Sequence, residues 1–217
     1  MSMTAFDPQY RCAVVQSAYL GSVRYYAAIM RARSVVVDDA MTGIPALWAH
    51  NHCRLSGANG MQQLVIPVDR ANYNSRTPMR DIVVSNHGDW RHLHWGAMFS
   101  AYGKSPFFEY VAYDLERIIK GDQKYLLDLN NELHQMVIDF LDLPIALASE
   151  DCVADADLDL RRAVGERRPD RLDIVDRPYY QLWASRHGFM PNLSILDLLC
   201  NTGREAVFTL LDMAKHQ

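Results

Sequence analysis

Cysteine is scarce and scattered in this sequence, which has 4 cysteines in 217 residues and no CxxC pair. This pattern excludes a disulfide framework and a clustered zinc site, and it suits a reducing compartment. The N-terminal residues contain no apolar run typical of a signal peptide, and no stretch approaches the roughly 20 apolar residues that a membrane-spanning helix needs. We therefore expect a cytoplasmic protein without a membrane span.

The chain also has no excess of positive charge. The formal net charge is −4 and the isoelectric point is near 6.0, which excludes the basic surface expected of a nucleic-acid-binding protein. The apolar fraction of 49% and the charged fraction of 22% are ordinary for a globular protein able to bury a core. We expect a folded protein that binds a small molecule rather than nucleic acid.

Local motifs that name a reaction are absent as well. There is no nucleophile elbow, Walker loop, HExxH pair or zinc-ligand spacing. The first expected strand is followed by no glycine-rich phosphate-binding fingerprint, so a dinucleotide-binding fold is not supported. The sequence alone identifies no reaction, cofactor, metal or oligomeric state.

What is present begins with an expected strand–helix–strand unit. Residues 11–20 predict a strand, a helix follows the Gly21-Ser22 turn, and residues 34–40 predict a second, apolar strand. Such a unit favours a parallel sheet, and ligands of parallel sheets collect at the carboxyl ends of the strands. The residues expected there are Gln16, Ser17, Tyr19, Asp38 and Asp39. The alternative for the two aspartates is the start of a solvated loop.

Residues 45–69 predict a β-hairpin around the turn sequence SGANG. His50 and His52 precede it with a spacing that, on a strand, points both side chains the same way. Such a pair can ligate a metal, but isolated H-x-H pairs are common and we assign no metal to this one. A further short strand is expected over residues 81–85.

The stretch 86–110 is unusually rich in histidine and aromatic residues. Either it lines a pocket or it forms a buried helix hairpin whose aromatics belong to the core. On a helix, His92 and His94 lie on nearly opposite sides, so they cannot chelate one metal together. Pro106 ends this helix, and further amphipathic helices are predicted as far as residue 141.

The last third of the chain changes character. Residues 145–150 predict a strand, and residues 150–173 form a charged, partly flexible excursion. Ser194 is a suitable N-cap for a helix that contains Asp197 among apolar residues. A carboxylate in such a setting needs a partner, and Arg161 and Arg204 are candidates. Altogether we predict one α/β domain over residues 1–217, with a mainly parallel central sheet, an antiparallel hairpin and a large helical half over about residues 89–141.

Several separated blocks, taken together, resemble the WbqC-like protein family in its compact form. These are QSAYLGSVRYYAAI, CRLSGANGMQQLVIPV, DIVVSNHGDWRHLHWGAMFSAYGKSPFFEY, the Tyr180-Gln181 pair and NLSILDLLCNTGREA. The family is poorly characterised and occurs with genes for O-antigen and other surface polysaccharides. The resemblance implies a cytoplasmic role in making a polysaccharide precursor. It suggests in particular acyl or aminoacyl transfer to a nucleotide-activated amino sugar.

The chain departs from the family pattern at two places. His50-Asn51-His52 stands where the family suggests Arg-Asn-Arg, and SAYLGSV lacks the expected Pro-Trp pair around Tyr19. If those arginines hold phosphates, this role is weaker or pH-dependent here.

Two hypotheses follow from the resemblance. In the first, the chain is a transferase in which His94 is the base, oriented by Asp81 or Asp89. The substrate-binding residues in this hypothesis are Gln16, Tyr19, His50, Asn51, His52, Tyr102, Arg161, Asn192, Ser194 and Asp197. It predicts a cleft where residues 16–20, 50–52, 89–94 and 192–197 meet. In the second, the chain is a non-catalytic binding or assembly protein, with the aromatics of 86–110 packed in the core.

Overall fold

A four-stranded parallel sheet, with strand order β5-β2-β1-β6, forms one layer of the fold. The computed structural model describes residues 8–42, 48–71, 73–143, 145–161 and 174–215. The strands are β1 (Tyr10–Val15), β2 (Ala32–Val37), β5 (Ala146–Leu147) and β6 (Leu158–Asp159). The helix α1 (Val23–Ile29) connects β1 to β2, which pair in parallel. This confirms the predicted strand–helix–strand unit.

Both faces of the sheet are covered, which fits the apolar runs in the second halves of β1 and β2, residues 12–15 and 35–37. Ala13 and Val15 of β1 belong to the main core, together with α1. Val14 and Val36 pack on the other face, beneath residues of η2 (Glu150–Asp155).

The first strand is shorter than predicted. It ends at Val15, and residues 16–22 form a loop before α1. Leu20 in this loop has a φ of 44°, which a strand cannot accommodate. Tertiary contacts of this loop, described below, override the strand pattern that the sequence suggests.

The predicted antiparallel hairpin is present. It consists of β3 (His52–Gly57) and β4 (Gly60–Val65), with Cys53 opposite Leu64. Gly60 has a φ of 102°, which glycine adopts without steric cost. A short helix, α2 (Trp48–Asn51), leads into β3.

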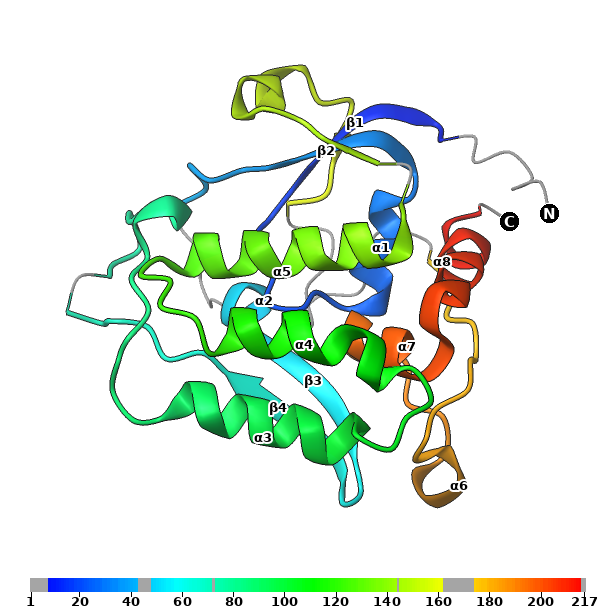
Figure 1. Cartoon of the computed structure of the whole chain (residues 1–217). Helices are drawn as coiled ribbons and strands as arrows, with labels where there is room; N and C mark the ends of the chain where they lie inside the picture. The colour runs from blue at the N-terminus through cyan, green and yellow to red at the C-terminus, as the bar shows by residue number, and fades with distance from the viewer. Residues whose placement is uncertain (1–7, 43–47, 72, 144, 162–173, 216–217) are drawn as a thin grey trace.

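The helical half lies on the same side of the sheet as α1, away from η2, and consists of three long helices that Figure 1 shows side by side. They are α3 (Trp90–Tyr102), α4 (Phe108–Ile119) and α5 (Leu126–Leu141), preceded by η1 (Met79–Asp81). Arg91 joins α3 to the end of α4 by donating to the Ile119 carbonyl at 2.9 Å. A carbonyl at a helix C-terminus lacks an intrahelical donor, so Arg91 serves as a cap.

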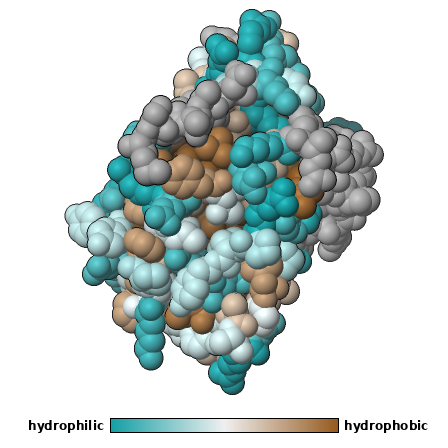
Figure 2. Space-filling model, turned by 90° about the vertical axis from the view of Figure 1, so that its right-hand side faces the viewer, coloured by the Kyte–Doolittle hydropathy of each residue, from teal (hydrophilic) through white to brown (hydrophobic). Residues whose placement is uncertain are grey.

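The chain closes with α6 (Ala184–His187), α7 (Ile195–Thr202), η3 (Gly203–Glu205) and α8 (Ala206–Ala214). Ser194 caps α7 through a hydrogen bond from the Leu196 N–H, as predicted. On the face that carries these helices, apolar side chains reach the surface in separate spots among hydrophilic ones (Figure 2).

The expectation of a strand over residues 81–85 is wrong, and the expected excursion is described only in its first part. Residues 81–85 form no strand; Val83 and Val84 make only isolated bridges to Tyr125 and Val68. Residues 150–161, the first part of the expected excursion, form η2 and β6. The rest of the excursion, residues 162–173, lies outside the described residues.

Candidate functional site

The loop between β1 and α1, residues 16–22, is the point at which distant parts of the chain meet. Ser17 accepts a hydrogen bond from Asn130 of α5, and the Tyr19 hydroxyl lies 2.9 Å from Nδ1 of His94 on α3. Because the loop follows a strand of the parallel sheet, it occupies the carboxyl edge, where ligands of such sheets bind.

The other end of the loop is fastened to the C-terminal region. Ser194 Oγ donates to the Leu20 carbonyl at 2.8 Å, and the Ile195 N–H donates to the Gly21 carbonyl at 2.8 Å. Asn192, with a φ of 53°, accepts a hydrogen bond at Oδ1 from the Arg24 N–H of α1. The left-handed conformation of Leu20 costs about 1–3 kcal/mol, which these contacts must offset.

The four segments expected to form a cleft therefore do come together around the loop. They meet through buried contacts: Tyr19 and Leu20 are 0% and 1% exposed, and His94 is 5% exposed. Gln16 is buried as well, and its carbonyl accepts a hydrogen bond from the Tyr25 hydroxyl at 3.1 Å.

Ser17, His50 and Asn130 form what we call the strand-end cluster. The Asn130 amide donates two hydrogen bonds, to Ser17 Oγ at 2.8 Å and to the His50 carbonyl at 2.7 Å. All three residues are buried. Asn130 thus joins α5 to both the β1–α1 loop and α2, and sets their relative positions.

Two atoms of the strand-end cluster have no hydrogen-bond partner, although both are buried: Nδ1 of His50 and Oδ1 of Asn130. Burial lowers the pKa of His50 to about 4, and a hydrogen bond to the Ser17 backbone opposes that shift. A bond that favours the protonated ring is one in which the ring donates, so the lone pair of neutral His50 remains on Nδ1. The Asn130 amide nitrogen already donates both of its hydrogens, so its unpartnered atom is the oxygen. Both unpartnered atoms are therefore acceptors.

His134 adds a third unpartnered atom one helical turn from Asn130. Its Nδ1 lies 3.0 Å from the Tyr26 hydroxyl, while its Nε2 is buried without a partner. Burial lowers its pKa to about 4. The helix turns His134 and Asn130 inward, so that both are buried.

His94, the predicted base, is enclosed. Trp90 packs edge-on against its ring with centroids 5.0 Å apart, and the Tyr19 hydroxyl occupies Nδ1. Burial lowers the His94 pKa to about 4, opposed by a hydrogen bond to the Val65 backbone. Burial raises the pKa of Tyr19 well above its usual value, so the hydroxyl stays protonated. The pair ties the loop to α3 and β4.

Asp81 and Asp89 were expected to orient His94. The structure places Tyr19 at Nδ1 instead, and both aspartates are exposed, Asp81 in η1 and Asp89 at the N-terminus of α3. Asp89 makes no capping hydrogen bond through its side chain.

His50 and His52 do not share one strand face. His50 lies in α2, which ends at Asn51, and His52 begins β3, because a four-residue helix precedes the hairpin. Asn51 lies between them, donating to the Ile66 carbonyl at 2.8 Å and accepting at Oδ1 from His52 at 2.6 Å. This segment is fixed mainly by contacts within the hairpin.

Arg161 lies at the same carboxyl edge, after β6, but its charge is already compensated. It donates to Asp38 Oδ2 at 2.7 Å and to both carboxylate oxygens of Asp159. These hydrogen bonds raise its pKa further. Asp38, after β2, is buried by this contact, whereas Asp39 pairs with Arg80. Arg161 therefore closes the edge of the sheet rather than presenting a free cation.

Asp197 belongs to a second buried polar group, which we call the C-terminal cluster: Tyr102, Tyr179, Gln181 and Asp197. Oδ2 of Asp197 accepts from the Tyr179 hydroxyl at 2.7 Å and from the Gln181 amide at 2.8 Å. These partners, and not Arg161 or Arg204, bind Oδ2 of the carboxylate, whereas Oδ1 is buried without a hydrogen-bond partner. Arg204 donates instead to the Phe140 carbonyl.

The C-terminal cluster fixes an extended segment onto α7. Gln181 also exchanges hydrogen bonds with the backbone of Met190, at 2.9 Å in each direction. Tyr102 accepts a hydrogen bond from the Ser56 N–H of β3 at 3.1 Å. Burial raises the Asp197 pKa to about 6, opposed by Tyr179, Tyr102 and Gln181.

Within the described ranges, no group of three or more His, Cys, Asp or Glu side chains could hold a metal ion. None of the described helices is long and apolar enough to cross a membrane.

Asn130 and His134 are the site residues that sequence reasoning undervalued. Both lie on the α5 face that carries Leu126, Leu133 and Val137 into the core. A polar residue at an apolar position of a predicted amphipathic helix is the signal that would have marked them.

A model of the WbqC-like protein family matches residues 16–167. "Uncharacterized protein Rv1507c" from Mycobacterium tuberculosis (strain ATCC 25618 / H37Rv) is 28% identical over 227 residues, covering 90% of this chain and 95% of that protein. No solved structure matches. The segment matched by the family model contains the whole strand-end cluster and ends before the residues of α7.

Proposed function

The chain belongs to the WbqC-like protein family, and from this premise we propose that it is a cytoplasmic transferase in the synthesis of a surface-polysaccharide precursor. It binds a nucleotide-activated amino sugar at the strand-end cluster and transfers an acyl or aminoacyl group to it. The attacking nitrogen of the sugar forms a bond to the carbonyl carbon of an activated donor. The oxygen or sulfur of the donor leaves, and the nitrogen loses a proton.

One observation carries this proposal: the unpartnered acceptors of the strand-end cluster. Folded proteins rarely leave buried polar atoms without partners, because each costs about 1–3 kcal/mol. Nδ1 of His50 and Oδ1 of Asn130 are such atoms at the carboxyl edge of a parallel sheet. A sugar offers what they need, since its hydroxyl and amino groups are hydrogen-bond donors.

His50 takes the place of His94 as the residue closest to the chemistry. With a pKa of about 4 it is neutral at pH 7, so it accepts a hydrogen bond from the nucleophile and orients it. A base this weak positions the amine better than it removes its proton. Nδ1 of His94 is occupied by Tyr19, and we assign His94 to holding the loop in place.

The phosphates of the nucleotide are not assigned to Arg161. Its guanidinium already donates to two carboxylates, and an incoming phosphate would have to displace Asp38 or Asp159. This conclusion replaces the expectation that Arg161 holds phosphate.

Thermal shift against nucleoside diphosphates, their sugar conjugates and free amino sugars tests the proposal. A ligand at a hundredfold excess over its dissociation constant adds about 2.7 kcal/mol, or roughly 5–10 °C in Tm for a chain of this size. We expect His50→Gln to lose the shift. His92→Gln is the matched control, because His92 is exposed on α3, and it should keep the shift. Equal shifts in both variants would place the ligand elsewhere.

The second candidate function is a non-catalytic binding or assembly protein. It is favoured by the burial of Trp90, Tyr102 and Phe108, which are core residues of the aromatic stretch. Phe99 and Tyr110 of the same stretch are more than half exposed, as in a protein-binding surface. No shift with any member of the panel would favour this function.

A further inference from the structure

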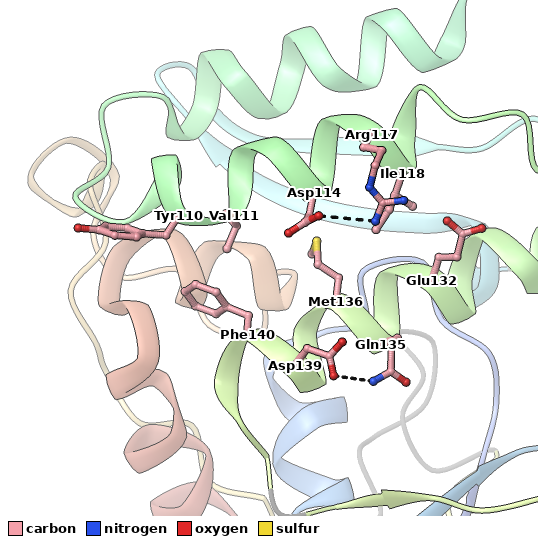
Figure 3. A pocket seen from close by; sticks show the side chains of 10 residues that line it. All are labelled: Tyr110, Val111, Asp114, Arg117, Ile118, Glu132, Gln135, Met136, Asp139 and Phe140. Atoms are coloured by element: carbon pink, nitrogen blue, oxygen red, sulfur yellow. Dashed lines mark hydrogen bonds and ion pairs between the residues drawn. The ribbon is translucent and has the colours of Figure 1, made fainter.

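The α4–α5 hairpin carries a surface groove that the proposed transferase function does not use. Its volume is about 560 Å³, and it is lined by one stripe of each helix. Figure 3 shows Asp114 of α4 and Asp139 of α5 with Met136 between them, and Glu132 farther along α5. The floor is apolar and the rim is acidic.

The rim has more negative than positive charge. Asp114, Glu132 and Asp139 contribute three carboxylates, and the one cation among the lining residues, Arg117, is paired with Asp114 at 3.6 Å. The pair is exposed on both sides, with side chains 57% and 55% accessible, so it is weak. Glu132 and Asp139 are exposed and bonded only to the neutral amides of Gln123 and Gln135 in the interactions described.

Aromatic residues beside the groove favour the same kind of partner. Tyr110 lies at one end of the lining and is 64% exposed, and Tyr113, one turn back from Arg117, is 78% exposed. The π face of a tyrosine attracts a guanidinium or an ammonium group. The same kind of contact occurs elsewhere in the chain, where Lys124 lies 5.1 Å from the centroid of the Tyr125 ring.

We propose that the α4–α5 groove is a docking site for an arginine- or lysine-rich segment of another protein. The aliphatic stems of its side chains lie along the floor around Met136, as such stems do on apolar surfaces. Their charged ends reach Asp114, Glu132 and Asp139, and one stacks on Tyr110. The groove is separate from the strand-end cluster, so docking and transfer can fail independently.

Fluorescence anisotropy with a labelled octapeptide of alternating arginine and serine tests the proposal on the full chain. We expect saturable binding that weakens with added salt, because exposed charges are screened. A peptide with glutamate in place of arginine should not bind.

Three variants separate this groove from bulk charge attraction. Glu132→Lys combined with Asp139→Lys should weaken binding by about tenfold or more, since two charge-assisted contacts become repulsive. Tyr110→Ala should weaken it by about threefold. Asp155→Lys combined with Asp157→Lys changes the net charge equally on the η2 side of the sheet, where both aspartates are exposed, and should leave the affinity within about twofold.

Equal losses in the two double variants, binding of the glutamate peptide, or no saturable binding of the arginine peptide would each overturn the proposal. Circular dichroism confirms that each variant is folded.

Discussion

The strand-end cluster and the C-terminal cluster are both buried and polar, yet they use their polar atoms differently. In the C-terminal cluster, Gln181 bonds through both its oxygen and its nitrogen, and Asp197 Oδ2 accepts two hydrogen bonds. In the strand-end cluster and His134 beside it, three buried polar atoms have no partner, against one in the C-terminal cluster, Oδ1 of Asp197. The first arrangement fastens a chain segment to a helix. The second has more atoms without a hydrogen-bond partner and lies at the carboxyl edge of the parallel sheet, so it is the better candidate for binding a ligand.

The largest expected effect is a loss of stability as the pH falls, to which the three buried histidines and Asp197 contribute with opposite signs. Each of His50, His94 and His134 has a folded pKa of about 4 against about 6.5 unfolded. Between these values the unfolded state binds more protons, so stability present at neutral pH is lost on acidification, on the order of 3 kcal/mol for each group at most. Asp197 acts oppositely: its folded pKa of about 6 lies above the unfolded value of 3.8, so protonating it favours the folded state in that window. With three groups against one, stability should fall.

Urea unfolding at about pH 7 and about pH 4.5 measures this effect. Asp197→Asn removes the opposing group, and its loss of stability between the two pH values should be greater than that of the wild type. Unchanged or higher stability at the lower pH would mean that the pKa values of the three buried histidines are not lowered on folding as described.

A smaller but still large effect is expected from Asp197→Leu. It leaves the Tyr179 hydroxyl and the Gln181 amide without their acceptor, and losing two charge-assisted hydrogen bonds should cost about 3–4 kcal/mol. Asp197→Asn keeps an acceptor and should lose roughly half as much. Equilibrium urea unfolding at neutral pH gives both values. If the two substitutions cost the same, the cluster does not depend on hydrogen bonding to the carboxylate.

The smallest expected effect is that of His50→Leu. The substitution removes an unpartnered buried nitrogen together with one hydrogen bond to the Ser17 backbone, so stability should change by less than about 1 kcal/mol. His134→Leu is the matched comparison, because it likewise removes one unpartnered nitrogen and one hydrogen bond, here to the Tyr26 hydroxyl, and should change stability by a similar amount. If His50→Leu lowers the free energy of unfolding by as much as Asp197→Leu does, the distinction between the two clusters is lost.

Local signals in the sequence identified the elements whose stabilising contacts are themselves local. The long apolar stripe of α5, the Ser194 cap and the turn glycine of the hairpin all lie within a few residues of what they determine. The parallel pairing of β1 and β2 also follows from a short strand–helix–strand pattern.

Features that depend on distant partners were missed. The end of β1 at Val15 is set by Ser17, whose partner Asn130 is 113 residues away. The partners of Asp197 are Tyr179 and Gln181, and only packing of an extended segment on α7 brings them together. His50 and His52 are separated by α2, a helix of one turn that has too few residues to show a period. The resemblance to a family indicated which segments meet, but not which of their polar atoms would have no hydrogen-bond partner.

The tie between Ser194 and Leu20 spans 174 residues, and this has a consequence for how the protein is made. Loop closure over such a distance is slow and follows local helix formation. While the ribosome is still adding the last helices, residues 16–22 have no Ser194 to hold Leu20 in its left-handed conformation. The β1–α1 loop is therefore among the last parts of the molecule to adopt its final conformation, and a chain interrupted before α7 would lack the contacts that hold Leu20 in place.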